Sequence, residues 1–258
     1  MLSIALTTYN GEKYILEQMD SLRTQTIPPD EVIICDDVSK DNTVQMVKDF
    51  IKKHELEDKW KLITNERNLS YADNFHQAMK LCSGDLIFCC DQDDIWHSDK
   101  LERMSQIMQN NLNIQLLGSE FTPFSSTEDA PRLSKKHLAR FTGDGSVEHI
   151  VLNNKTIFID DGSEGCTVCL RKSFLDEIQP YWYSGWAHDE FIWKLALCRD
   201  GCFVWHSSTL DRRFHSNNTS KKKLHTLDKR IFFIQNLEKS HNIMLQYARN
   251  CGSSAETE

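Results

Sequence analysis

The sequence predicts an α/β protein with a mostly parallel sheet flanked by helices. Short apolar runs of β-prone residues alternate with segments of helical periodicity across residues 1–110, which is the pattern of a doubly wound sheet. Three of the four strands predicted there end in polar or acidic residues, as at the ligand-binding edge of such sheets. The chain of 258 residues is long enough to bury a substantial core.

The first two strands are predicted at residues 2–8 and 31–35, where apolar and β-branched residues form short unbroken runs. Between them, apolar residues at helical spacing predict a helix over 12–26, which the Pro28–Pro29 pair would end. Gly11 is expected to adopt the positive φ that the turn after the first strand needs.

The following elements continue the alternation. Asp41 and Asn42 predict the start of a helix, and residues 60–64 predict a short third strand. Apolar residues from Phe75 to Cys82 predict the next helix. The resulting β-α-β-α-β-α-β order predicts parallel strands, because each crossover passes through a helix.

An acidic stretch follows the fourth predicted strand. Residues 86–90 predict a strand buried on both faces, and Asp91, Asp93 and Asp94 come directly after it. Neighbouring carboxylates repel one another, so the stretch predicts a site for Mg²⁺ or Mn²⁺, which prefer hard oxygen ligands. The alternative is that the acids only cap the next helix, for which Ser98 is the expected N-cap.

The polar ends of the parallel strands indicate a nucleotide site, in which Asp36 and Asp37 would face the base or ribose. The sequence has no G-x-G-x-x-G after the first strand and no Walker lysine motif, which argues against dinucleotide redox chemistry and P-loop phosphoryl transfer. The net charge of -8 argues against a general nucleic-acid-binding protein.

The cysteines and the N-terminus predict a cytoplasmic protein. The nine cysteines are an odd number, and several lie in apolar runs, which is typical of reduced thiols. The first residues are strand-like and lack the layout of a signal peptide. Cys166, Cys169, Cys198 and Cys202 could instead form a zinc site.

The pattern weakens after about residue 110. Residues 114–121, 165–170 and 201–206 predict strands. Residues 122–145 are polar and turn-rich and predict an insertion over the ligand-binding edge. Residues 147–159 fit either a helix or a strand.

A helix is predicted up to Cys198, with His188, Asp189 and Glu190 at its N-terminal end. The helix dipole there would favour an ionised carboxylate. The residues alone leave two roles open for Asp189, an N-cap and a chemical group.

Basic residues towards the C-terminus also have two interpretations. Arg212 and Arg213 in a polar loop could hold phosphate or balance an acidic surface. Residues 221–249 predict a terminal helix. The lysine run at 221–223 could contact anionic lipid or remain solvated.

Together these segments resemble the inverting GT-A glycosyltransferases of family 2 and, within them, the bacterial rhamnosyltransferase-like enzymes of surface-polysaccharide and O-antigen synthesis. The segments that match are SIALTTYNGEKYILEQMDSLRTQT, DEVIICDDVSKDNT, NLSYADNF, FCCDQDDIWHSDKL, GCTVCLRKSF, HDEFIWKLAL and RRFHSNNTS. The resemblance implies a GT-A, Rossmann-like domain over residues 1–220, with a nucleotide-binding half (1–110) and an acceptor and catalytic half (111–220). Residues 221–258 would form a C-terminal helix and a disordered tail.

The resemblance implies roles for single residues in donor binding. Thr7 and Tyr9 would line the base pocket, and Asp37 would hydrogen-bond the pyrimidine. Asn74 would face the nucleotide, and Asp91 would lie near the ribose.

The resemblance also implies a metal site and a base. Asp91 and Asp93 would be the acids of the DXD motif, with Asp93 the more direct ligand of Mn²⁺ or Mg²⁺. His215 would approach the diphosphate or the metal, and Asp189 would be the general base. Where the family usually reads Tyr-Arg-Gln-His, this chain reads Arg-Arg-Phe-His before and at His215, which leaves the donor contacts of this segment open.

The implied activity is inverting transfer of a sugar from dTDP-rhamnose or a UDP-hexose to a hydroxyl of a saccharide or lipid-linked saccharide. A lipid-linked acceptor would bring the protein to the inner face of the cell membrane. Acceptor choice is expected in residues 122–164, and the oligomeric state, a homo-oligomer included, stays open. Two other functions are considered: a nucleotidyltransferase that makes a nucleotide sugar, and a binding module that has lost catalysis.

Overall fold

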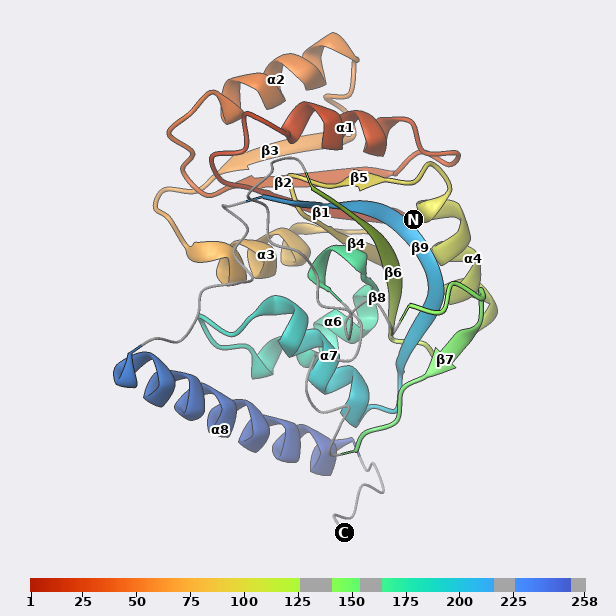
Figure 1. The fold of residues 1–258 in the computed structure, drawn as a ribbon, viewed down its shortest axis with the longest axis vertical. Helices are drawn as coiled ribbons and strands as arrows, with labels where there is room; N and C mark the ends of the chain where they lie inside the picture. The colour runs from red at the N-terminus through yellow and green to blue at the C-terminus, as the bar shows by residue number, and fades with distance from the viewer. Residues whose placement is uncertain (126–140, 154–163, 216–225, 252–258) are drawn as a thin grey trace.

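The computed structural model describes residues 1–125, 141–153, 164–215 and 226–251. The strands in this part of the chain are β1 (Leu2–Thr8), β2 (Glu31–Asp36), β3 (Trp60–Thr64), β4 (Leu86–Cys90), β5 (Ile95–Trp96), β6 (Leu116–Ser125), β7 (Val147–His149), β8 (Cys169–Arg171) and β9 (Cys202–Phe214). They form one sheet in the order β3-β2-β1-β4-β8-β6-β9-β5, with β7 paired to β9. The predicted α/β fold with a largely parallel central sheet is confirmed (Figure 1).

The first four strands are parallel neighbours, and each lies where the sequence predicted it. β1 pairs with β2 on one side and with β4 on the other, in registers that run from Ser3↔Glu31 and Leu2↔Leu86. β8 then pairs antiparallel with both β4 and β6, while β6 and β9 are parallel to each other. The order of the strands therefore reverses at β1 and β4, which is the topological switch point where open α/β sheets bind ligands.

Helices cover both faces of the sheet (Figure 1). The helices are α1 (Ile15–Arg23), α2 (Thr43–Lys53), α3 (Ser70–Leu81), α4 (Lys100–Asn110), α6 (Lys172–Ile178), α7 (His188–Cys198) and α8 (Leu227–Asn250), with short 3-10 turns η2 (Gly165–Thr167) and η3 (Gln179–Tyr181). Alternate residues of β1 face opposite layers: Ile4 and Leu6 pack with α1, α2 and α4, whereas Ala5 packs with α3, α6 and α7. The strands β1, β2 and β4 are thus buried on both faces, as their nearly continuous apolar sequences predicted.

Several local predictions were wrong. Asp99, not Ser98, is the N-cap position of α4. Positive φ falls at Asn10 (50°) rather than at Gly11. Residues 165–170 do not form one strand, because η2 begins with Gly165 packed so tightly on α7 that a Cβ there would lie 2.6 Å from Nε2 of His188.

The second half of the chain has longer strands than predicted. Residues 122–125 extend β6, since they pair with 211–214 of β9 after two register shifts. Arg212 and Arg213 therefore lie in a strand and not in a loop. The rest of the predicted 122–145 insertion up to residue 140, residues 154–163 and the lysine run at 221–223 lie outside the described residues.

Both halves of the chain contribute strands to the same sheet, and the division at residue 220 stays a prediction. None of the helices that the structure describes combines the length and apolar composition needed to span a bilayer. Cys166, Cys169, Cys198 and Cys202 are buried free thiols. Among the described residues, the group of side chains placed to share a metal ion includes only the first of them, so the zinc alternative is not supported.

Candidate active site

The candidate site begins at the switch point, where the loops after β1 and β4 are joined by two hydrogen bonds. The backbone N–H of Tyr9 donates to Oε1 of Gln92 at 2.9 Å, and Nε2 of Gln92 donates to the carbonyl of Tyr9 at 3.0 Å. A Cβ at Gly11 would lie 2.2 Å from the same Gln92 amide, so a larger residue there would displace this side chain from its hydrogen bonds with Tyr9. The ring of Tyr9 is 48% exposed, while Thr7 at the end of β1 is buried.

The carboxylate of Asp37, after β2, holds the start of α3. Its Oδ1 accepts hydrogen bonds from the backbone N–H of Leu69 (2.7 Å) and from Nδ2 of Asn65 (2.9 Å), and its Oδ2 accepts one from the N–H of Ser70 (2.9 Å). Asn74 is buried beside it and bonds to Asn65 and to the carbonyl of Cys35. Asp37 and Asn74 therefore form a buried network between β2 and α3.

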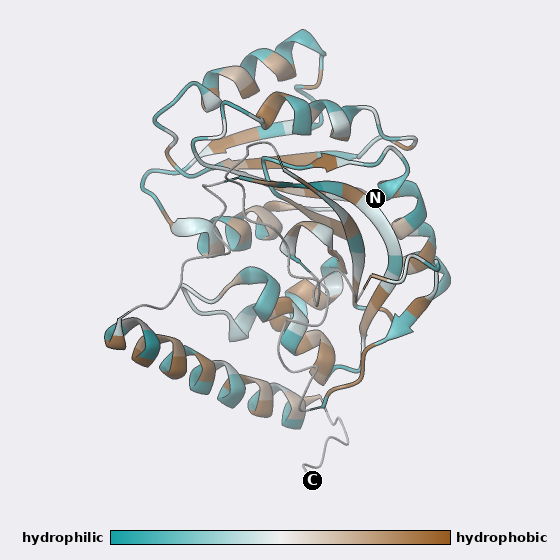
Figure 2. Cartoon of the chain, viewed as in Figure 1, coloured by the Kyte–Doolittle hydropathy of each residue, from teal (hydrophilic) through white to brown (hydrophobic). Residues whose placement is uncertain are grey.

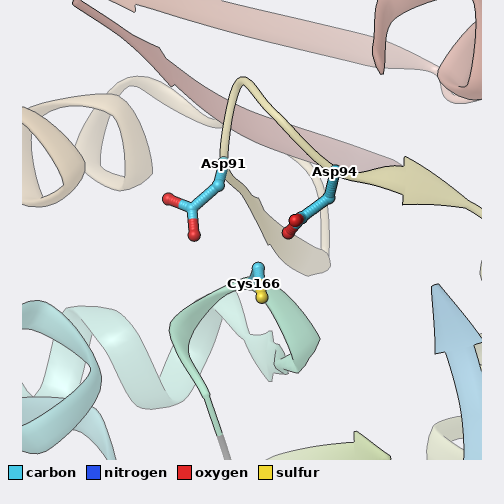
Figure 3. Close-up of side chains that lie close together, drawn as sticks. All are labelled: Asp91, Asp94 and Cys166. Carbon is cyan, nitrogen blue, oxygen red and sulfur yellow. The ribbon is translucent and has the colours of Figure 1, made fainter. Parts of the chain in front are cut away.

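Asp91 and Asp94 descend from the loop after β4 towards Cys166 in η2 (Figure 3). A carboxylate oxygen of each and the Cys166 Sγ all lie within 4.8 Å of one another. Oδ1 of Asp94 accepts a hydrogen bond from the N–H of Arg213 at 3.0 Å. Its Oδ2 is buried with no hydrogen-bond partner in the described part of the chain.

The crowding of acids makes their negative charge costly. Burial, followed by the neighbouring charges of Asp93 and Asp94, raises the pKa of Asp91 well above its usual value. Burial and the charge of Asp93 raise the pKa of Asp94 to about 6. A cation placed between these carboxylates would remove both the desolvation penalty and the repulsion.

Asp93 lies outside this group and pairs with His215. Its Oδ2 lies 2.7 Å from Nε2 of His215, and its carbonyl accepts a hydrogen bond from Nε of Arg213 at 2.8 Å. The His215 ring packs against Tyr14 with centroids 5.0 Å apart. Since Arg213 also bonds to Asp94, the end of β9 fixes the loop after β4 at two points.

Arg212 is a buried cation whose charge acts on the acids of the site. Its side chain is 11% exposed, ion-paired with Glu164 at 2.8 Å and placed over the rings of Phe121 and Phe214. Its positive charge opposes the upward pKa shifts of Asp91 and Asp94. From the sequence, Arg212 was expected in a polar loop. Its burial follows from its place in the extended strand β9.

Asp189 lies in the first turn of α7, as predicted, and accepts a hydrogen bond from the N–H of Glu190 at 2.9 Å. Burial raises its pKa, while that bond and the charge of Arg212 lower it by less. The charge of Asp189 in turn raises the pKa values of Asp91 and, after burial, of Tyr71. Asp189, Asp91 and Arg212 thus share one electrostatic environment, although they come from three different elements.

Lys100 is a residue of this region that the sequence did not single out. It is fully buried at the start of α4, donates from Nζ to the carbonyl of Cys166 at 2.8 Å, and lies 3.8 Å from the centroid of the Trp96 ring. Lys100, Met104 and Met108 recur at i, i+4 and i+8, so helical spacing could have placed this lysine on the buried face.

The residues fit a divalent cation. Carboxylate oxygens are the ligands that Mg²⁺ and Mn²⁺ prefer, and the unpartnered Oδ2 of Asp94 lies next to Asp91. The thiol of Cys166 is a poor ligand for these hard ions, because burial raises its pKa well above the usual value and keeps it protonated. Of the ligands expected from the sequence, Asp91 lies in this group, whereas Asp93 and His215 form the adjacent pair.

Comparison with known proteins identifies the family. The family model described as glycosyl transferase family 2 matches residues 3–174, two thirds of the chain. The chain belongs to glycosyl transferase family 2. The match includes the loops after β1, β2 and β4 and ends in α6, before Asp189.

Relatives of this family 2 glycosyltransferase include three bacterial proteins that are named as glycosyltransferases. WfgD of Escherichia coli, a UDP-Glc:alpha-D-GlcNAc-diphosphoundecaprenol beta-1,3-glucosyltransferase, is 36% identical over 44% of this chain and 43% of its own length. The putative teichuronic acid biosynthesis glycosyltransferase TuaG of Bacillus subtilis is 23% identical over 97% of this chain and 95% of its own. The dTDP-rhamnosyl transferase RfbG of Shigella flexneri is 25% identical over 83% and 72%. The aligned part thus spans less than half the length of WfgD.

Solved structures share the fold. Residues 1–349 of TarS from S. aureus, in complex with UDP-GlcNAc, superpose with a TM-score of 0.69 at 19% identity, covering 95% of this chain and 71% of that one. The mannosyltransferase PcManGT from Pyrobaculum calidifontis, in complex with GDP-Man and Mn²⁺, gives a TM-score of 0.63 at 16% identity, covering 95% and 64%.

Proposed function

We propose that this family 2 glycosyltransferase is a metal-dependent inverting enzyme of bacterial surface-polysaccharide synthesis. The observation behind the proposal is the pairing of the Asp91–Asp94 loop with Asp189 in one electrostatic environment at the switch point of the sheet. One group of carboxylates would hold the cation, the cation would bind the departing diphosphate, and the other carboxylate would activate the acceptor.

The donor proposed is a nucleoside-diphosphate sugar with a pyrimidine base, either dTDP-rhamnose or a UDP-hexose. Thr7 and Tyr9 at the end of β1 would line the base pocket, and the exposed ring of Tyr9 is available for stacking. Asp37 and Asn74 would support this pocket through the hydrogen bonds that fix the start of α3. The names of WfgD and RfbG favour UDP-glucose and dTDP-rhamnose respectively.

The cation proposed is Mn²⁺ or Mg²⁺, held by carboxylates of the loop after β4. Asp91 and Asp93 are the ligands expected from the motif, with His215 beside them, and Asp94 adds an unpartnered oxygen. When bound, the cation would stabilise the negative charge that develops on the departing nucleoside diphosphate.

Asp189 is proposed as the general base. It would accept the proton of an acceptor hydroxyl while that oxygen attacks the anomeric carbon from the face opposite the diphosphate, and a single displacement of this kind inverts the configuration. The raised pKa of Asp189 favours proton transfer, because a stronger base accepts a proton more readily. The Glu190 N–H bond would orient the carboxylate for this step.

The acceptor proposed is a hydroxyl of a saccharide, free or linked to a lipid. Tyr71, in the first turn of α3, is 46% exposed and within electrostatic reach of Asp189, so its ring is suited to contact the acceptor sugar. A lipid-linked acceptor, as in the name of WfgD, would bring the protein to the inner face of the cell membrane.

Titration calorimetry of UDP and dTDP, each with and without Mn²⁺, tests the proposal on the wild type and on Asp93→Ala. We expect metal-dependent binding that falls at least tenfold in the variant, and the preferred nucleotide would identify the donor class. Absence of binding under every condition would contradict the proposal and favour a binding module without catalysis. Asp99→Ala, in the exposed turn after the site, is the matched control and should bind like the wild type.

A further inference from the structure

The first half of α8 exposes large apolar side chains that no described part of the chain covers. Four of them, residues 231–234, are consecutive, and the brown patches along this helix are visible in Figure 2. The exposed fractions are Leu227 72%, Ile231 44%, Phe232 63%, Phe233 51% and Ile234 61%. These five residues are called the apolar end of α8. A cluster of this kind on a water-facing surface marks an interaction site.

The second half of the same helix is docked. Met244 and Tyr247 are 4% and 1% exposed against α6 and α7, and Ser240 accepts a hydrogen bond from Nζ of Lys194 at 2.8 Å. The hydroxyl of Tyr247 donates to Glu177 at 2.7 Å. The anchoring of α8 is therefore achieved by its second half, and the apolar end is not needed to attach the helix.

The arrangement of the apolar end favours a continuous apolar medium over a single partner helix. Successive residues of an α-helix are about 100° apart, so the four residues 231–234 point in all directions around the axis. A helix packed against one partner buries a single stripe, whereas this one apolar turn, which lies between charged residues 228–230 and the polar pair 235–236, can be covered on all its sides only by a continuous medium.

The positive charge of the adjoining sequence indicates that the surface bound by the apolar end is anionic. Residues 221–230 contain four lysines, one arginine and one aspartate, a net charge of +4 in a protein whose net charge is -8. The structure of residues 221–225 is not described, and only their charge is used. Apolar side chains next to a basic cluster are typical of helices that lie in the interface of an anionic membrane.

The apolar end is also tethered near the site. Thr226, just before α8, follows His215 by eleven residues, a length of chain that reaches at most about 40 Å when fully extended. A surface that immersed the apolar end would therefore hold His215 within that reach of the membrane.

We propose that the apolar end of α8 docks the protein onto an anionic lipid surface by inserting Phe232, Phe233 and their neighbours among the acyl chains. This inference rests on the proposed lipid-linked acceptor, and it adds the docking surface of the protein and the charge of the lipid. Docking itself requires no donor, acceptor or turnover, so its failure can be distinguished from failure of the proposed transferase activity.

Flotation of the full chain with vesicles tests the proposal. We expect the wild type to float with vesicles of phosphatidylglycerol and phosphatidylcholine and at least tenfold less with phosphatidylcholine alone. Phe232→Ser/Phe233→Ser should reduce flotation with the anionic vesicles at least tenfold. Leu245→Ser is the matched control, because Leu245 is 44% exposed on the docked half of the same helix, and it should float like the wild type.

Three results would overturn the proposal. The first two are no flotation of the wild type with anionic vesicles, and equal flotation of the wild type and the double variant. A third is a lipid-free dimer, seen by sedimentation, that the double variant converts to monomer without any vesicle binding; a second copy would then cover the surface. Circular dichroism and thermal melting verify that the double variant is folded, and Phe233→Glu is the second variant, expected to lose flotation as well.

Discussion

The loops after β2 and β4 both place carboxylates at the same edge of the sheet, yet they use them in opposite ways. Asp37, after β2, accepts three hydrogen bonds from Asn65, Leu69 and Ser70. Asp91, after β4, has no hydrogen bond to its carboxylate within the described residues, and its pKa is raised by burial and by its acidic neighbours.

The difference teaches that position at a strand end does not determine the role of an acid. A carboxylate whose oxygens are occupied by protein donors contributes to folding, whereas one held among like charges without partners is available to a ligand. Glu120 on β6 belongs to the first class, since it accepts hydrogen bonds from the N–H groups of Thr142 and Gly143 and contacts His206 at 3.0 Å.

The largest expected effect concerns Asp189. Its carboxylate accepts one hydrogen bond, from the N–H of the neighbouring Glu190, and is proposed to accept the proton of the acceptor hydroxyl. Asp189→Asn should lower sugar transfer by about 10²–10⁴-fold, because the amide cannot accept the hydroxyl proton. Nucleotide binding and the melting temperature should change little. The measurement is release of nucleoside diphosphate with donor and acceptor, and lost donor affinity with turnover unchanged would contradict the assignment.

The direct test of the comparison is the pair Asp37→Asn and Asp91→Asn. Asp37→Asn should lower the free energy of unfolding by about 2–4 kcal/mol, because an amide NH₂ would face groups that already donate. Asp91→Asn should leave stability unchanged or raise it by about 1 kcal/mol, because it removes a charge from among like charges. Urea unfolding measures both, and equal losses in the two variants would remove the distinction.

His206 extends the comparison to pH. Burial lowers its pKa, but hydrogen bonds to Glu148 (2.9 Å) and Glu120 (3.0 Å) raise it by more, so the net shift is upward. A raised pKa in the folded state stabilises the protein fully below the unfolded pKa of about 6.5, and this contribution is lost as pH rises through the folded value.

The expected size is at most about 1 kcal/mol, because Glu148 is 58% exposed and solvent screens that pair. Urea unfolding at pH 6 and pH 8.5 should show a decrease in the wild type that is smaller in His206→Gln by this amount, because the raised pKa values of Asp91 and Asp94 contribute to the decrease in both proteins. A variant that retained the full pH dependence would assign the effect to another group.

The smallest expected effect lies beside Asp37. Val38 has a φ of 65°, a left-handed conformation that is unfavourable for a β-branched residue. Val38→Gly should raise the free energy of unfolding by about 0.5–1 kcal/mol, the relief of strain less the greater freedom of glycine in the unfolded chain. Thermal melting measures it, with Val38→Ala as the control that keeps a Cβ. A lower melting temperature for the glycine variant would contradict this account of the loop.

The first half of the fold could be predicted because its signals are local. Strands β1, β2 and β4 are nearly continuous apolar runs, and the helices between the first four strands have clear periodicity. The second half could not be predicted to the same extent, since β7 and β8 have three residues each and β6 depends on pairing with β9 about 90 residues away.

The candidate site divides in the same way. The acids after β4 and the helix start at Asp189 were accessible from their place in the pattern. Cys166 and Arg212 were not, because their directions depend on a 3-10 turn and on a strand extension that no local signal predicts. The hydrogen-bond partners that distinguish Asp37 from Asp91 come together only when the chain is folded.

The two hydrogen bonds between Tyr9 and Gln92 have a thermodynamic consequence. They connect the loop proposed to receive the nucleobase with the loop proposed to receive the cation, so a ligand that orders one loop also orders the other. Linkage is reciprocal: by whatever factor the cation tightens the nucleotide, the nucleotide must tighten the cation. Gln92→Ala, by separating the loops, would remove the part of this coupling that passes through the protein, while the coupling from direct contact between the cation and the diphosphate would remain.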